Sequence, residues 1–124
     1  MVDIAEVIRT RPANLTYKEM MILADKYEPG SEEYNDVFEI AVRMFPEEPI
    51  ANLNVANAAL SRGDLATAAK YLPKAGQSPE ATLARANFAF LQGNYDEAGE
   101  LYEIAAQFLP EAQQIYQEYL ESGY

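Results

Sequence analysis

The chain contains the same stretch twice, end to end, and this duplication limits the possible folds more than any other feature. The two copies span residues 49–78 and 79–108, a spacing of 30 residues without a gap. A short period with small residues and a glycine in register is typical of an array of helical hairpins. The copies agree at Pro49/Pro79, Ala51/Ala81, Leu53/Leu83, Ala56/Ala86, Asn57/Asn87, Ala59/Ala89, Gly63/Gly93, Ala68/Ala98, Ala75/Ala105 and Gln77/Gln107.

The composition argues against catalysis and against a metal or cofactor. The 124 residues include no cysteine and no histidine, so thiol chemistry and the usual general base near neutral pH are missing. No stretch approaches the ~20 apolar residues of a membrane span, and the first residues do not resemble a secretory signal. We therefore expect a soluble, non-catalytic protein that does not insert into a membrane.

Charge is distributed unevenly along the chain. The formal net charge is −11, and all nine basic residues precede Ala86, so residues 86–124 contain seven acids and no base. A nucleic-acid-binding surface needs clustered lysine and arginine to contact phosphates. The sequence therefore predicts no nucleic-acid partner.

Capping signals predict a helical hairpin upstream of the doubled stretch. Thr16 followed by Glu19 forms a capping box, so a helix should begin there and end near Tyr27. Ser31 precedes two acids and should cap a second helix that runs to about Phe45.

Prolines and glycines mark the helices of the two copies. Pro49 and Pro79 suit the first position of a helix, and Gly63 and Gly93 should end those two helices. Pro73 lies inside the next helix and should kink or end it, because proline removes a backbone hydrogen bond.

A last helix should begin at Pro110 and cover the exposed apolar end of the array. The chain then divides into an N-terminal segment at 1–13, a degenerate repeat at 14–46, two regular repeats at 49–78 and 79–108, and a capping helix at 110–122. The expected fold is all-α, a single domain of about three antiparallel helix pairs with a C-terminal cap.

The two copies resemble the tetratricopeptide repeat, in which small residues lie where two helices cross and a Gly-Asp/Asn-Tyr turn joins them. Two features depart from the family pattern. Asn52 and Thr82 replace the aromatic residue of its first helix, and the period is 30 residues, whereas the family repeats about every 34. The matching residues are Ala56, Gly63-Asp64, Ala68, Leu72 and Ala75 in the first copy, and Ala86, Gly93-Asn94-Tyr95, Ala98, Tyr102, Ala105 and Pro110 in the second.

The segments 30–46 and 51–54 are also similar to the C-terminal repeat module of uncharacterised envelope proteins in some Gram-negative bacteria. That resemblance implies a fragment of a larger bacterial protein located in the periplasm or cell envelope. Without that resemblance, the composition, which lacks cysteine, fits a cytoplasmic location as well as one in the cell envelope.

The tetratricopeptide resemblance implies a concave groove lined by the first helix of each pair, where partners usually lie. Asn57 and Asn87 stand out there, because a carboxamide both donates and accepts hydrogen bonds and a pair of them suits the backbone of an extended peptide. Two alternatives to ligand binding are open: each Asn side chain forms a local hydrogen bond within the protein, or Asn recurs at both positions only because the segment was duplicated. Register places Lys18, Met21, Asp25, Leu53, Asn57, Leu60, Leu83, Asn87 and Phe90 in this groove.

The resemblance also implies that relatives which grip a terminal carboxylate add lysines or arginines in this groove. Leu53 and Leu83 stand where such a lysine could be, so a more apolar protein or peptide segment is the expected ligand. The predicted function is therefore a protein- or peptide-binding adaptor. The alternative is a structural spacer or self-association module of a larger envelope or assembly protein. Six tyrosines are expected to pack between helices: Tyr27, Tyr71, Tyr95, Tyr102, Tyr116 and Tyr119.

Overall fold

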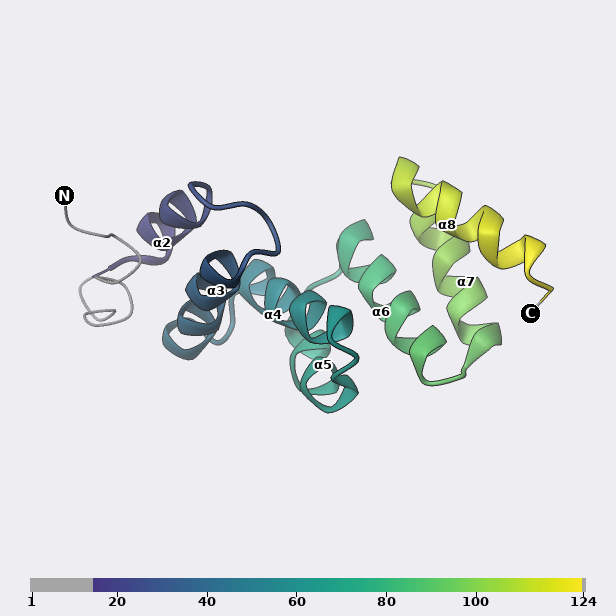
Figure 1. Cartoon of the computed structure of the whole chain (residues 1–124), viewed down its shortest axis with the longest axis horizontal. Coiled ribbons are helices and arrows are strands. Elements are labelled where there is room, and N and C mark those ends of the chain that lie inside the picture. Colours follow the sequence, from purple (N-terminus) through teal and green to yellow (C-terminus); the bar gives the residue numbers. More distant parts are fainter. Residues whose placement is uncertain (1–14, 124) are drawn as a thin grey trace.

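Helix pairs follow one another along an elongated array in the computed structural model, which describes residues 15–123 (Figure 1). No strand occurs within that range. The predicted all-α array with a C-terminal cap is therefore confirmed, whereas the segment 1–13 lies outside the described residues. The helices are α2 (Tyr17–Ala24), α3 (Glu32–Met44), α4 (Pro49–Ser61), α5 (Leu65–Tyr71), α6 (Pro79–Leu91), α7 (Tyr95–Ala106) and α8 (Pro110–Glu121).

Local capping chemistry explains where the helices begin. The Thr16 hydroxyl accepts a hydrogen bond from the Glu19 N–H at 3.2 Å, and the Glu19 carboxylate accepts one from the Thr16 N–H at 3.2 Å. Ser31 and Ser78 cap α3 and α6 in the same way, each through its side-chain oxygen. Because each cap satisfies a backbone donor that the helix leaves unpaired, these starts were readable from the sequence.

Two helices end differently from a regular α-helix. α2 stops at Ala24 and not near Tyr27, because the next turn tightens to i→i−3 bonds, from Lys26 N–H to the Leu23 carbonyl and from Tyr27 N–H to the Ala24 carbonyl. α5 stops at Tyr71 and a 3₁₀ turn, Leu72–Lys74, follows. The early end predicted from Pro73 is confirmed, and the predicted end of α2 was three residues too long.

The core consists of three apolar clusters that follow one another along the array. The first joins α2, α3 and α4, the second joins α4, α5 and α6, and the third joins α6 to α7 and α8. Alanines at the crossings are fully buried, among them Ala56, Ala86 and Ala98. Each cluster shares a helix with the next, so neighbouring pairs support one another as in other repeat proteins.

The last helix covers the end of the third cluster. Tyr116 and Tyr119 of α8 pack against it, and the Tyr119 hydroxyl donates to the Tyr95 carbonyl at 2.7 Å. Tyr102 is 4% exposed, as a packing position requires, whereas Tyr95 is 40% exposed and its expected burial was wrong. The Tyr95 ring instead lies edge-on to Phe90 at the surface.

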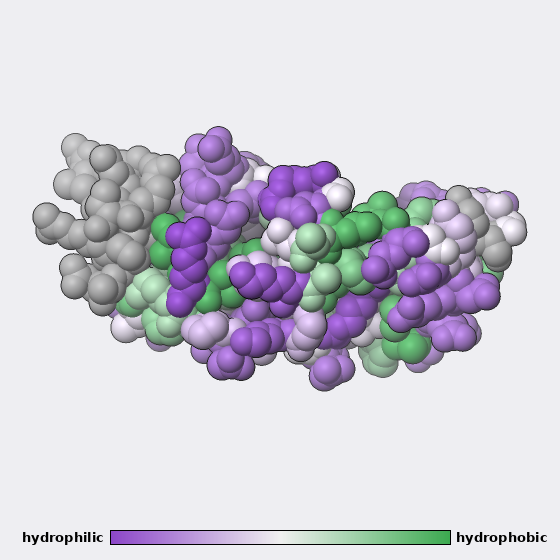
Figure 2. Space-filling model, turned by 90° about the horizontal axis from the view of Figure 1, so that it is seen from below, coloured by the Kyte–Doolittle hydropathy of each residue, from purple (hydrophilic) through white to green (hydrophobic). Residues whose placement is uncertain are grey.

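Apolar side chains also reach the surface in patches between hydrophilic ones (Figure 2). Phe108 and Leu91 are 65% and 48% exposed. Within residues 15–123, no helix combines the length and the apolar character that crossing a membrane requires.

Candidate functional site: a hollow between α4 and α6

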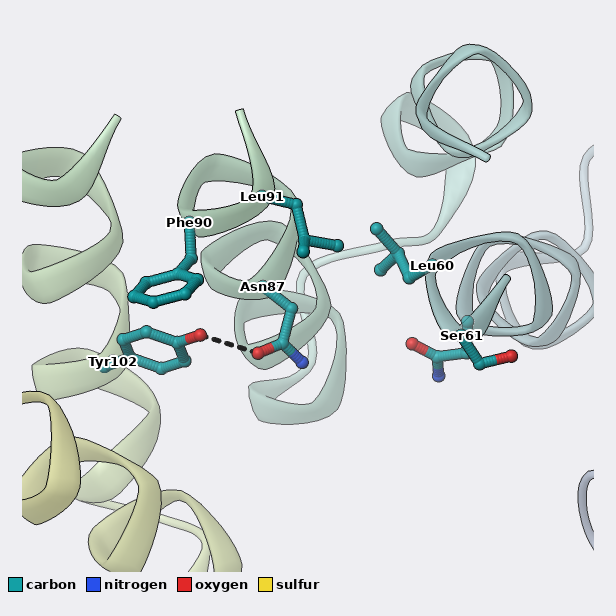
Figure 3. Close-up of a pocket in the computed structure, with 7 residues that line it drawn as sticks. Leu60, Ser61, Asn87, Phe90, Leu91 and Tyr102 are labelled. Carbon is teal, nitrogen blue, oxygen red and sulfur yellow. Dashed lines mark hydrogen bonds between the residues drawn. The ribbon is translucent and has the colours of Figure 1, made fainter. Parts of the chain in front are cut away.

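A hollow of about 300 Å³ lies between the first helices of the two regular repeats, with one wall from α7. Figure 3 shows its side chains converging from the three helices. Six of its seven residues form three pairs whose members are 30 positions apart. The hollow is thus a direct product of the duplication. The pairs are Asn57/Asn87, Leu60/Phe90 and Ser61/Leu91, and the seventh residue is Tyr102.

Four of the nine groove residues expected from the sequence line this hollow, namely Asn57, Leu60, Asn87 and Phe90. The other five lie elsewhere. Leu53 and Leu83 are half-buried and pack against the second and third apolar clusters. Met21 is half-buried against the first cluster, and Asp25 is exposed at the end of α2. Lys18 is likewise exposed on α2.

The two asparagines are equivalent in sequence but not in their surroundings. The Asn87 carboxamide oxygen accepts a hydrogen bond of 2.7 Å from the Tyr102 hydroxyl (Figure 3). In the first copy, Leu72 occupies the position of Tyr102 and has no hydroxyl to offer. Asn57 is exposed, and its carboxamide has no hydrogen-bond partner within residues 15–123. Local bonding therefore occupies the oxygen of Asn87 and leaves Asn57 free.

Three lining residues were missed by the sequence reasoning. Ser61 and Leu91 directly follow Leu60 and Phe90, so the repeat register contained the signal that identifies them. Tyr102 was assigned to the core alone, and although its ring is buried, its hydroxyl reaches the hollow. Burial raises the pKa of Tyr102 above its usual value, so the phenol stays protonated and donates to Asn87.

Leu60, Phe90 and Leu91 form the apolar part of the hollow, and the two carboxamides together with the hydroxyls of Ser61 and Tyr102 supply its polar groups. Leu60 and Leu91 point toward one another across the space between α4 and α6 (Figure 3). The Tyr95 ring packs edge-on against Phe90, with ring centroids 5.2 Å apart. This combination suits an apolar side chain flanked by peptide backbone. Its seven lining residues include no charged side chain.

A group of three or more carboxylates that would suit a metal ion is not found within residues 15–123.

Comparison with known proteins agrees with the repeat architecture. The tetratricopeptide repeat model matches residues 35–79 and 74–113, more than half of the chain. No curated protein and no solved structure matches this chain. α2 precedes the matched segments, so the assignment of residues 14–46 as a degenerate repeat stays a prediction, as does the envelope origin. The chain belongs to the tetratricopeptide repeat family.

Proposed function

We propose that this chain is a non-catalytic adaptor that binds an extended peptide segment in the hollow between α4 and α6. Tetratricopeptide repeats generally mediate protein–protein interactions. The observation that carries the proposal is the unpartnered carboxamide of Asn57, which faces solvent beside the hollow. A polar group exposed next to apolar walls is available to a ligand without breaking any bond of the protein.

The two asparagines have different parts in this proposal. Asn57 offers its carbonyl and both N–H donors, so it pairs with an N–H and a carbonyl of the peptide backbone. The Asn87 oxygen already accepts a bond from Tyr102, which uses one of its two lone pairs, so in this proposal Asn87 contributes its N–H donors, to a peptide carbonyl. The space between Leu60, Leu91 and Phe90 receives one apolar side chain. At about 300 Å³ the hollow is at the small end of ligand pockets, which favours a single side chain over a whole helix.

The test begins with peptides selected for binding to the intact protein from a displayed random library. Fluorescence anisotropy then measures the affinity of each selected peptide for the wild type and for Asn57→Ala. We expect Kd to rise about three- to tenfold in Asn57→Ala, since a neutral hydrogen bond contributes about 0.5–1.5 kcal/mol. The unfolding free energy should stay the same, because the Asn57 side chain makes no hydrogen bond with any residue in the range 15–123.

Asn35→Ala is the matched control, since Asn35 is the same residue type on α3 and does not line the hollow. Its Kd should equal that of the wild type. Selected peptides that bind both variants and the wild type equally would contradict the proposal. The spacer or self-association role stays a prediction, and no observation of the described residues favours it over the adaptor.

A further inference from the structure

A second and larger hollow, of about 490 Å³, lies between α3, α4 and α5. It shares no residue with the hollow between α4 and α6. Three of the chain's nine basic residues meet there, although the chain as a whole is strongly acidic. They come from three elements: Arg43 from the last turn of α3, Lys70 from α5 and Lys74 from the 3₁₀ turn that follows α5.

The positive charge of these side chains is largely uncompensated. Neither Arg43 nor Lys70 forms an ion pair with any residue between 15 and 123. Lys74 lies 3.2 Å from a Glu47 carboxylate oxygen, but the Glu47 side chain is 82% exposed. An exposed pair of this kind contributes little to stability. Another anion therefore competes for Lys74 at low cost.

The remaining walls are fixed by the fold. Asn52 is 1% exposed, and its amide nitrogen donates to the Pro46 carbonyl at 3.0 Å and to the Glu48 carbonyl at 2.8 Å. These bonds hold the turn between α3 and α4, so the Asn52 side chain does not move to fill the space. The Tyr71 ring adds a flat apolar wall, with the Lys70 ammonium 5.4 Å from its centroid.

We propose that this hollow binds a small molecule that carries a carboxylate or phosphate group. The guanidinium of Arg43 suits both groups because its N–H donors form a planar fork, and the two lysines add point charges. An apolar part of the ligand packs on Tyr71. The volume lies within the usual range of small-molecule sites. A long polyanion is disfavoured, because the net charge of −11 repels it beyond the hollow.

The experiment is a titration of the intact, ¹⁵N-labelled protein, followed by amide NMR shifts, at constant ionic strength. Citrate probes the carboxylate arm and inorganic pyrophosphate probes the phosphate arm. At least one of them should produce saturable shifts at the end of α3 and around Lys70 to Lys74, and none at Asn57 or Asn87. The Arg43→Gln/Lys70→Gln variant should raise Kd at least tenfold.

Lys26→Gln/Arg62→Gln is the matched control, since it removes the same charge at exposed positions outside the hollow. It should leave Kd within twofold. Lys74→Gln, at a half-exposed side chain, is the second test if the double variant melts early, and it should also weaken binding. Non-saturating shifts, an equal loss in the control, or shifts that appear on concentrating the protein without an added anion would overturn the proposal. None of these outcomes bears on the hollow between α4 and α6.

Discussion

At the residue scale, duplication has given two asparagines the same position but different partners. The Tyr102 hydroxyl donates a hydrogen bond to Asn87. Leu72, at the same position in the first copy, has no hydroxyl to donate to Asn57. The Asn87 carboxamide is thereby held by a bond to α7, whereas the Asn57 carboxamide has no partner among residues 15–123. A ligand that uses both positions meets one fixed donor group and one adaptable group.

Removing the Tyr102 hydroxyl should show what this bond contributes. We expect Tyr102→Phe to lower the free energy of unfolding by about 1 kcal/mol, because the half-buried Asn87 oxygen loses its donor. Urea denaturation followed by circular dichroism measures the change. Tyr116→Phe is the control, since Tyr116 is half-buried on α8 and its hydroxyl has no partner in the described part of the chain. Equal losses in the two variants would show that the hydrogen bond contributes nothing.

At the element scale, the position of α8 depends on the absence of a side chain on α7. Gly99 is buried beneath Tyr119, and a Cβ built on Gly99 would lie 2.6 Å from the Tyr119 ring carbon that carries the hydroxyl. Tyr119 is itself tied to the Tyr95 carbonyl, so it cannot withdraw without losing that bond. The capping helix therefore lies so close to α7 at this point that Gly99 leaves no room for a side chain.

Gly99→Ala should accordingly loosen the cap. Alanine gains about 1 kcal/mol over glycine in a helix interior, but overpacking costs typically 1–3 kcal/mol. We expect a lower melting temperature, measured by calorimetry. In a Tyr119→Ala background the clash is gone, so the same substitution should raise the melting temperature. A higher melting temperature in both backgrounds would contradict the close packing.

At the scale of the whole molecule, the helices of residues 15–123 form a row, and their apolar side chains pack in three successive clusters and not in one central core. Each apolar cluster joins only adjacent helices, so stability should vary along the chain. α2 has 8 residues and packs at one end, whereas α6 has 13 and contributes to two clusters.

Hydrogen exchange measured by mass spectrometry should reveal this gradient. We expect α2 to exchange fastest and α6 slowest among the helices of residues 15–123, because local opening is easiest where few neighbours pack. Gly99→Ala should speed exchange in α7 and α8 and leave α2 and α3 unchanged. Uniform acceleration along the whole chain would indicate a single cooperative unit and contradict the expectation.

Four of the seven residues that line the hollow could be predicted from the sequence, and there is a physical reason why the rest could not. Asn57, Leu60, Asn87 and Phe90 followed from register alone, because helical periodicity fixes which side of a helix a residue occupies. Leu53 also belongs to that series, but it packs inward on the second cluster. How far a side chain turns toward a neighbouring helix depends on the crossing of the helices, which the period does not encode.

The sequence by itself determined the helix starts, the pairing of helices, the early end of α5 at Pro73 and the repeat of the inner-face residues. All of these depend on caps, prolines and periodicity, which act within a few positions along the chain. Only the tertiary structure decided that Tyr102 would bond to Asn87 and that Arg43 would meet Lys70 and Lys74. Those partners come from different helices, so their meeting depends on how the helices pack.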